Sequence, residues 1–138
     1  MNRVILVMIL AISSLFGQLE QILVTENFLE KDIKIVDIRT PPEWKQTGIV
    51  KGSYTIMFFD EKGGYDMKHF LSELNKIVKD GEKFALICRT GSRTTVIAPF
   101  LSQKLGYNVV NLKGGIEKLI KEGYRPSPYR VSPLFQKP

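Results

Sequence analysis

The sequence predicts an α/β domain with a mostly parallel central sheet flanked by helices. Short apolar runs of strand length alternate with segments whose apolar residues recur at helical spacing. The chain has 138 residues, of which 43% are hydrophobic, which is enough for one domain with a single core. No internal repeat, heptad run or low-complexity tract points to another class of fold.

The first half of the domain should contain two strands and two helices. The run IKIVDI at residues 33–38 is the first clear strand. Pro41 and Pro42 start a short helix that carries Trp44, because proline is tolerated in a first helical turn. A second strand is expected near residues 54–57, followed by a loop that contains Gly63 and Gly64. A helix with its apolar face toward the core follows, and that face consists of Phe70, Leu71, Leu74, Ile77 and Val78.

The second half continues the alternation of strand and helix. The run FALI at residues 84–87 predicts a fully buried central strand. A helical pattern spans residues 96–105, and Pro99 inside it should kink or shorten that helix. A further strand is expected at residues 109–112 and a last helix at residues 116–122.

The two ends of the chain differ from the domain between them. Residues 1–17 combine Arg3 with an apolar stretch of signal-peptide length, so we expect a secretory signal cleaved after Gly17. The protein would then be exported, to the periplasm if the host is a Gram-negative bacterium. If the segment is not cleaved, it would act as a membrane anchor. Residues 18–125 form the expected domain, and residues 126–138 form a Pro-rich tail that could lie along its surface.

Charge and cysteine content narrow the possible partners. The net charge of +6 arises from dispersed basic residues, which favours small anionic substrates over nucleic acid. A single cysteine, Cys88, cannot form an intramolecular disulfide, so its thiol should be either buried or used in chemistry. With one cysteine and the single histidine His69, we expect no metal site built from those ligands, and no cofactor.

The segment CRTGSR, residues 88–93, connects the strand FALI to the next helix. Ligands of parallel α/β sheets bind beyond the carboxyl ends of the strands, where this loop should lie. Gly91 permits a tight curl, and such a curl before a helix turns successive N–H groups inward as an anion-binding nest. That nest, together with Arg89 and Arg93, should favour the thiolate form of Cys88. The loop therefore predicts a nucleophilic thiolate in an anion cradle.

At this loop the sequence resembles the rhodanese family, whose single-domain members often carry CxxGxR. The segment Ile35 to Arg39 with Glu43 and Trp44 is similar to the family's early VDVR and E(Y/W) motif, and Leu112 to Ile116 is similar to its late LxGG turn. The likeness covers about residues 33–123 and implies a three-layer rhodanese-like domain. The sequence departs from the family at Gly48-Ile49, where a histidine usually intervenes, and after the double glycine, where a tryptophan is often found.

The resemblance implies sulfur transfer. The Cys88 thiolate would take the outer sulfur of a donor such as thiosulfate or a polysulfide, form a persulfide, and pass that sulfur to a thiol or cyanide acceptor, which could belong to a partner protein. Substrate binding would fall to the loop residues Arg89, Thr90, Gly91, Ser92 and Arg93, through backbone N–H groups and the hydroxyls of Thr90 and Ser92.

Other residues receive supporting roles. Arg89 should lie at the entrance to the active-site loop and set the preference for sulfonate-bearing donors, whereas Arg93 should hold the shape of the loop. Asp37 and Arg39 are expected to be structural, with Asp37 capping or pairing near the base of the loop. Trp44 should be a packing residue and His69 a solvated one. Phe58, Phe59 and Tyr65 could line the pocket or fill the core.

Two other functions remain open. The chain could be a sulfur-carrier or partner-binding rhodanese module without high turnover. It could also be a phosphatase or arsenate reductase on the same fold, although the loops of those enzymes follow CxxxxxR, and Cys88 and Arg93 are separated by one residue fewer.

Overall fold

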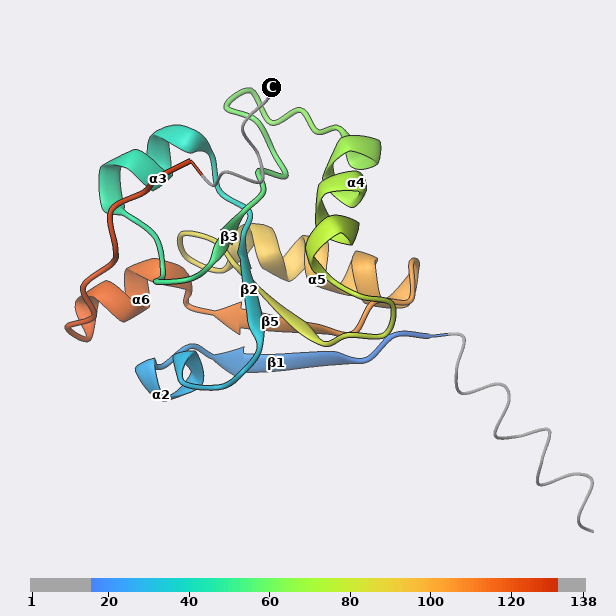
Figure 1. Cartoon of the computed structure of the whole chain (residues 1–138), viewed down its shortest axis with the longest axis horizontal. Coiled ribbons are helices and arrows are strands. Elements are labelled where there is room, and N and C mark those ends of the chain that lie inside the picture. Colours follow the sequence, from blue (N-terminus) through green and yellow to red (C-terminus); the bar gives the residue numbers. More distant parts are fainter. Residues whose placement is uncertain (1–15, 132–138) are drawn as a thin grey trace, which may run out of the picture.

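The computed structural model describes residues 16–131 and contains one five-stranded sheet (Figure 1). Every strand pair is parallel, and the spatial order is β1-β5-β4-β2-β3. The strands are β1 (Leu19–Leu23), β2 (Lys34–Asp37), β3 (Tyr54–Thr55), β4 (Phe84–Ile87) and β5 (Val109–Lys113). The predicted α/β class is confirmed, and the predicted signal segment lies, except for its last two residues, outside the described part of the chain.

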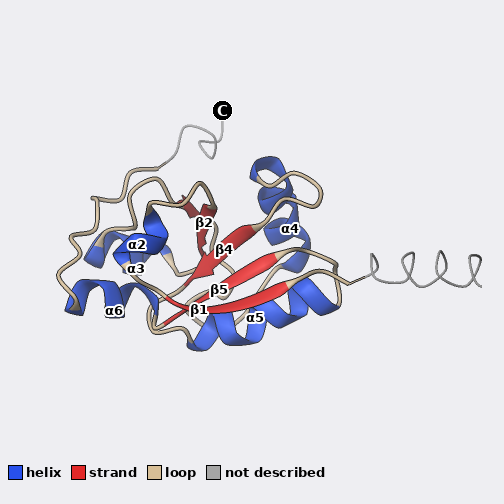
Figure 2. Ribbon diagram, turned by 90° about the horizontal axis from the view of Figure 1, so that it is seen from below, coloured by secondary structure: helices blue, strands red, loops and turns tan. Residues whose placement is uncertain are grey.

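Helices connect the strands and cover both faces of the sheet (Figure 2). They are α2 (Glu26–Leu29), α3 (Pro41–Thr47), α4 (Met67–Ile77), α5 (Ser92–Gln103) and α6 (Gly115–Lys121). Two core clusters result, one on each face of the sheet. Helices α4 and α5 contribute to the cluster that contains Val36 and Leu86, whereas α2 and α6 contribute to the cluster that contains Ile35 and Ala85. Neighbouring strand residues enter opposite clusters because successive side chains point to opposite faces, which gives the three-layer architecture.

Strand β1 was not predicted. Its sequence, LEQIL, mixes polar and apolar residues, and none of its side chains is fully buried. Leu23, for example, is 61% exposed. The strand pairs only with β5, about ninety residues away in the chain, with Leu19 opposite Val109. A half-exposed edge strand lacks the apolar run by which a central strand is recognised.

Helix α5 runs through Pro99, so the expectation that this proline shortens the helix was wrong. Proline removes one backbone donor and crowds the carbonyl one turn earlier, which belongs to Thr95. Thr95 is exposed, so water can satisfy its carbonyl. The hydrogen-bond ladder resumes after the proline, where the Lys104 N–H donates to the Phe100 carbonyl over 3.0 Å.

The described part of the C-terminal tail lies along the domain surface, as predicted. Ser127 and Ile49 exchange two backbone hydrogen bonds of 2.8 Å in an antiparallel bridge. The ring of Tyr129 lies 5.3 Å from that of Trp44, centroid to centroid. Residues 125–131 thereby cover α3. Within the described residues, no helix has the length and apolarity that crossing a membrane requires.

Candidate active site

Cys88 follows directly after β4, at the end of the sheet where the parallel strands terminate. Its neighbours at this edge are the end of β2, where Asp37 pairs with Ile87, and the turn after β5. The Cys88 residue has no exposed surface. Its Sγ accepts a hydrogen bond from the Gly91 N–H over 3.1 Å and lies 3.7 Å from Oγ1 of Thr94.

The carbonyl groups at the start of the loop are held by helix α6. The Ile116 N–H donates to the Cys88 carbonyl over 3.0 Å, and the Glu117 N–H donates to the Arg89 carbonyl over the same distance. A trans peptide directs its C=O and N–H groups to opposite sides, and the described backbone contains no cis bond. The N–H groups of Arg89 and Thr90 are therefore turned away from α6.

The end of the loop is arranged in the same way by α5. The Gly91 carbonyl accepts from the Thr95 N–H over 3.1 Å and from the Thr95 Oγ1 over 2.7 Å, so the next N–H, that of Ser92, points out of the helix start. Within residues 16–131, the Gly91 N–H donates to Sγ. No acceptor is found there for the other loop N–H groups, which belong to Arg89, Thr90, Ser92 and Arg93. The loop donor that the structure places on Sγ is the Gly91 N–H, and an anion-binding nest around Cys88 stays a prediction.

Two glycines allow α6 to approach the loop this closely. Gly115 has φ = +66°, and a Cβ placed there would lie 2.3 Å from the Arg89 carbonyl oxygen. Gly91 has φ = +96° and would bring a Cβ to 3.0 Å from the Gly114 nitrogen. Only glycine combines such backbone angles with such close backbone contact. The double glycine after β5 is therefore part of the site.

Arg93 points toward α3 and forms a two-pronged ion pair with Glu43. Its Nη1 and Nη2 each donate to one carboxylate oxygen over 2.7 Å. The hydrogen bonds from Arg93 are the main cause that lowers the pKa of Glu43 from 4.5 to about 2. Glu43 also accepts from the Thr40 hydroxyl over 3.0 Å, at the start of α3. The pair thus ties the start of α5 to the start of α3.

Arg89 has a more exposed carboxylate partner. Its guanidinium lies 3.7 Å from Glu117 on α6, and 60% of the Arg89 side chain is exposed. Glu117 in turn lies 3.4 Å from Lys121, one helical turn further on. The side chain stands at the surface, as expected for a residue at the entrance to the loop, and it leans toward α6.

Asp37 and Arg39 form a buried ion pair beneath α3. The Arg39 guanidinium donates to both Asp37 oxygens, with Nη2 to Oδ2 at 2.8 Å, and neither side chain has exposed surface. Trp44 Nε1 donates to Asp37 over 3.0 Å, and Arg39 also donates to the Thr47 hydroxyl and the Gly48 carbonyl. All three guanidinium nitrogens and both carboxylate oxygens of the pair have partners within the protein, an arrangement suited to a structural role.

The remaining predicted residues differ in exposure. Thr90 and Ser92 are exposed, and their hydroxyls are 3.4 Å apart. Phe58 is buried and stacks on Tyr65, which is 64% exposed. His69 is exposed near the start of α4. A hollow beside the loop is lined by Thr40, Glu43, Phe59, Asp60, Glu61, Gly63 and Arg93.

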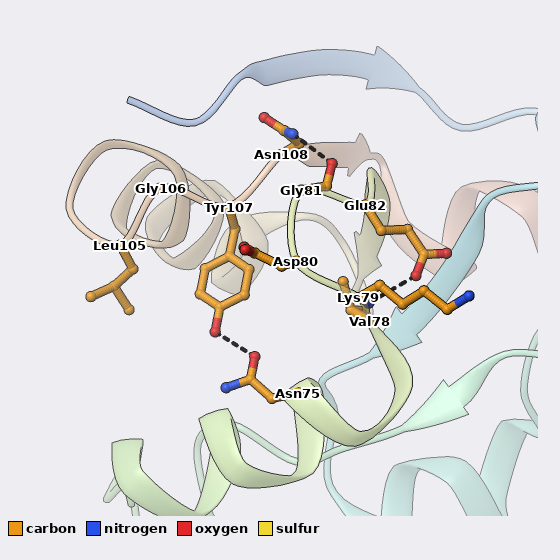
Figure 3. A pocket seen from close by; sticks show the side chains of 10 residues that line it. All are labelled: Asn75, Val78, Lys79, Asp80, Gly81, Glu82, Leu105, Gly106, Tyr107 and Asn108. Atoms are coloured by element: carbon orange, nitrogen blue, oxygen red, sulfur yellow. Dashed lines mark hydrogen bonds between the residues drawn. The ribbon is translucent and has the colours of Figure 1, made fainter. Parts of the chain in front are cut away.

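A second hollow, shown in Figure 3, lies at the opposite edge of the sheet, before β4 and β5 begin. Several of its polar side chains form hydrogen bonds with other residues of its lining. The Tyr107 hydroxyl donates to Asn75 over 2.7 Å, and the Asn108 amide donates to the Gly81 carbonyl over 2.8 Å. It is distant from Cys88, and its contacts join the loops that precede the two strands. In the described part of the chain, no group of three or more potential metal ligands comes together.

Comparison with known proteins agrees with this geometry. The protein-family model described as Rhodanese-like domain matches residues 21–122. The chain belongs to the rhodanese-like domain family. An uncharacterized protein of Rickettsia prowazekii is 31% identical over 93 residues, which are 64% of this chain and 73% of that protein.

Solved structures of rhodanese-like proteins have the same fold. A Staphylococcus saprophyticus protein is 32% identical, with a TM-score of 0.57 over 75% of this chain and 96% of that one. A rhodanese-related protein of Thermoplasma volcanium is 32% identical, with a TM-score of 0.52 over 72% of this chain and 85% of that one. The three-layer rhodanese-like fold expected from the motifs is confirmed.

The structure brings the predicted loop residues around Cys88 and adds four that sequence reasoning did not assign to the site. These are Glu43, Thr94, Gly115 and Glu117. Glu43 and Gly115 belong to the motifs on which the family resemblance rests, so the sequence marked both residues but did not indicate their contacts with the loop. Thr94 directly follows the loop and could have been included by proximity. Nothing in the sequence marks Glu117, because its link to Arg89 depends on the placement of α6.

Proposed function

We propose that this rhodanese-like domain is a sulfurtransferase that carries a sulfane sulfur on Cys88 as a persulfide. The observation that supports this most is the Gly91 N–H on the Cys88 sulfur, beside further loop N–H groups for which the described residues provide no acceptor. A persulfide ends in a singly charged sulfur, and a nest of backbone dipoles stabilises such a charge without titrating.

The cysteine needs no neighbouring base for this chemistry. A thiolate attacks the outer sulfur of the donor, and no proton has to be removed during that step. Among the described residues, the side-chain group within hydrogen-bond distance of Sγ is the hydroxyl of Thr94, and the chain's single histidine is exposed on α4. A hydrolase that must activate water would call for a base at this position.

A phosphatase is the less favoured alternative, because of Arg93. Tight binding of a phosphate is typically achieved by a guanidinium that donates two parallel hydrogen bonds to its oxygens. Both terminal nitrogens of Arg93 are already bonded to Glu43 at 2.7 Å. The loop is thus suited to a small sulfur anion held by N–H groups.

Intact-mass spectrometry tests the proposal. The purified chain is exposed in turn to thiosulfate, polysulfide and mercaptopyruvate, and we expect a gain of one sulfur atom that cyanide or a thiol removes. Cys88→Ser should gain no sulfur and should keep its circular dichroism spectrum, because serine is nearly isosteric. Sulfur transfer retained by this variant would refute the mechanism, whereas loading without turnover would identify a carrier module.

We also propose that the protein is exported, with its mature chain starting near Gln18. The composition of residues 1–17 supports this proposal. The N-terminal sequence of the protein purified from its native host, and the fraction in which it is found, provide the test. Full-length chain in the soluble cytoplasmic fraction would contradict it, and full-length chain in the membrane fraction would identify an anchor.

A further inference from the structure

We propose that the Cys88 site selects singly charged sulfur donors, such as thiosulfonates and hydropersulfides, over the thiosulfate dianion. This inference rests on the proposed sulfur transfer and concerns its substrate class. It follows from the charges around the loop, where both arginines already have carboxylate partners. The nest therefore acts with backbone dipoles and without a surplus of positive charge.

Arg93 is the more firmly neutralised of the two arginines. Its two hydrogen bonds to Glu43 measure 2.7 Å, and both side chains are mostly covered, with about a quarter of each exposed. The pair would have to break before Arg93 could bind a donor. Breaking a partly buried two-pronged pair leaves Glu43 without its main partner, which opposes such a movement.

Arg89 is neutralised by Glu117. The ion pair spans 3.7 Å, and the Glu117 N–H donates to the Arg89 carbonyl, so the Glu117 backbone is held beside the loop. Glu117 and Thr90 line the same hollow. Any donor that approaches Arg89 from this side also meets the negative charge of Glu117, and the repulsion is greater for a dianion than for a monoanion.

The other charges near the entrance to the loop add no positive surplus. Lys118 and Lys121 line the hollow beside Thr90 together with Glu117 and Glu122, so this lining carries two charges of each sign. Asp60 and Glu61 line the hollow beside Arg93 and are both negative. A cradle of this kind compensates one negative charge better than two.

The chemical step is the same for both classes of donor. The Cys88 thiolate forms a bond to the outer sulfur, and the bond between the two donor sulfurs breaks with its electron pair on the inner sulfur. The leaving group is sulfite when the donor is thiosulfate, and a sulfinate when the donor is a thiosulfonate. The persulfide anion remains on Cys88 in both cases. The reaction with thiosulfate therefore carries one more negative charge than the reaction with a thiosulfonate, from the bound donor to the leaving group.

The test compares Glu117→Gln with Glu20→Gln. Glu20 lies on β1, at the end of the sheet opposite Cys88, and pairs with Lys83. Its side chain is 42% exposed, close to the 41% of Glu117, so it is a matched control away from the loop. For each variant, kcat/KM for sulfur transfer to cyanide is measured with thiosulfate and with benzenethiosulfonate. The ratio of the two values is compared with that of the wild type, which cancels the different intrinsic reactivities of the donors.

We expect Glu117→Gln to raise kcat/KM for thiosulfate more than for benzenethiosulfonate. Because Coulomb energy is proportional to charge, a gain of about twofold for the monoanion corresponds to about fourfold for the dianion. The shift should fade at high salt. An unchanged ratio, or an equal shift in Glu20→Gln, would overturn the inference while leaving sulfur transfer intact. If neither donor loads Cys88 of the wild type, the proposed function itself fails.

Discussion

Arg93 shows how a side chain named in the loop motif can act away from the reacting sulfur. Its guanidinium holds Glu43, and Glu43 also caps α3 through Thr40. The pKa of Arg93 is raised, chiefly by its hydrogen bonds to Glu43, with smaller contributions from Cys88 and Asp37. The residue therefore connects the loop, α3 and the base of the site, and its role is to position them.

Replacing Arg93 by alanine should lower both stability and kcat. The change leaves the Glu43 carboxylate partly buried without its partner, which costs about 1–3 kcal/mol, and it frees the start of α5. Urea unfolding and steady-state kinetics measure the two effects. Lys76→Ala serves as the control because Lys76 pairs with Glu73 at 2.8 Å but is 59% exposed, so little stability should be lost. Full activity in Arg93→Ala would show that the loop holds its shape alone.

The same ion pair predicts a dependence of stability on pH. The folded-state pKa of Glu43 is about 2, below its ordinary value of 4.5. A lowered pKa contributes stability above the unfolded-state pKa, and this contribution is lost as pH falls toward the folded-state value. The wild type should therefore exceed Glu43→Gln in unfolding free energy above about pH 4.5, and the difference should shrink toward pH 2. Denaturation at several pH values measures it, and a constant difference would contradict the assignment.

Helix α6 acts as one element of the site through its backbone. Its first N–H groups, at Ile116 and Glu117, fix two successive loop carbonyls. The predicted nest would lie on the opposite side of those peptides because the peptide plane is rigid. Gly114 and Gly115 make this contact possible through their positive φ angles.

Gly115→Ala should therefore disturb both the fold and the chemistry. A residue with a Cβ at positive φ costs about 1–2 kcal/mol, and the contact at 2.3 Å with the Arg89 carbonyl forces a further shift. We expect a loss of more than about 2 kcal/mol in stability and a clear drop in kcat/KM. Gly81→Ala is the matched control, since Gly81 has φ = +76° and open space around its Cβ position. It should lose about 1 kcal/mol and keep its activity, and equal activity losses in both variants would refute the role of α6.

At the scale of the whole molecule, the C-terminal tail secures the half of the domain that carries α3. The Ser127 bridge to Ile49 and the contact of Tyr129 with Trp44 hold the tail against this helix. Trp44 in turn donates to the buried Asp37. The tail is thus linked, through two contacts, to the ion pair beneath the site.

Tyr129→Ala should destabilise the fold by about 0.5–1.5 kcal/mol, the worth of an aromatic pair. Trp44 is the only tryptophan of the chain, so its fluorescence reports on this contact directly. We expect a red-shifted emission and a lower thermal midpoint in the variant. Arg130→Ala, at the neighbouring exposed position, should change neither. Unchanged emission in Tyr129→Ala would mean that the tail does not cover Trp44 in solution.

The sequence by itself determined the fold class and the loop around Cys88. Central strands such as β4 are recognisable because burial on both faces requires an uninterrupted apolar run. The loop is contiguous, and its curl depends on Gly91 and on the start of the next helix, all of which are local features. The positions of Cys88 and Gly91 could therefore be predicted before any tertiary contact was known.

Only the tertiary structure decided which residues surround that loop. Strand β1 was missed because an edge strand gains its stability from pairing with β5 rather than from its own pattern. Glu43 and Glu117 lie on helices far apart in sequence, and they reach the loop because the sheet order places the ends of β2, β4 and β5 together. The ion pairs of Arg89 and Arg93 depend on that strand order, because each arginine pairs with a glutamate on a helix that only the folded sheet brings close.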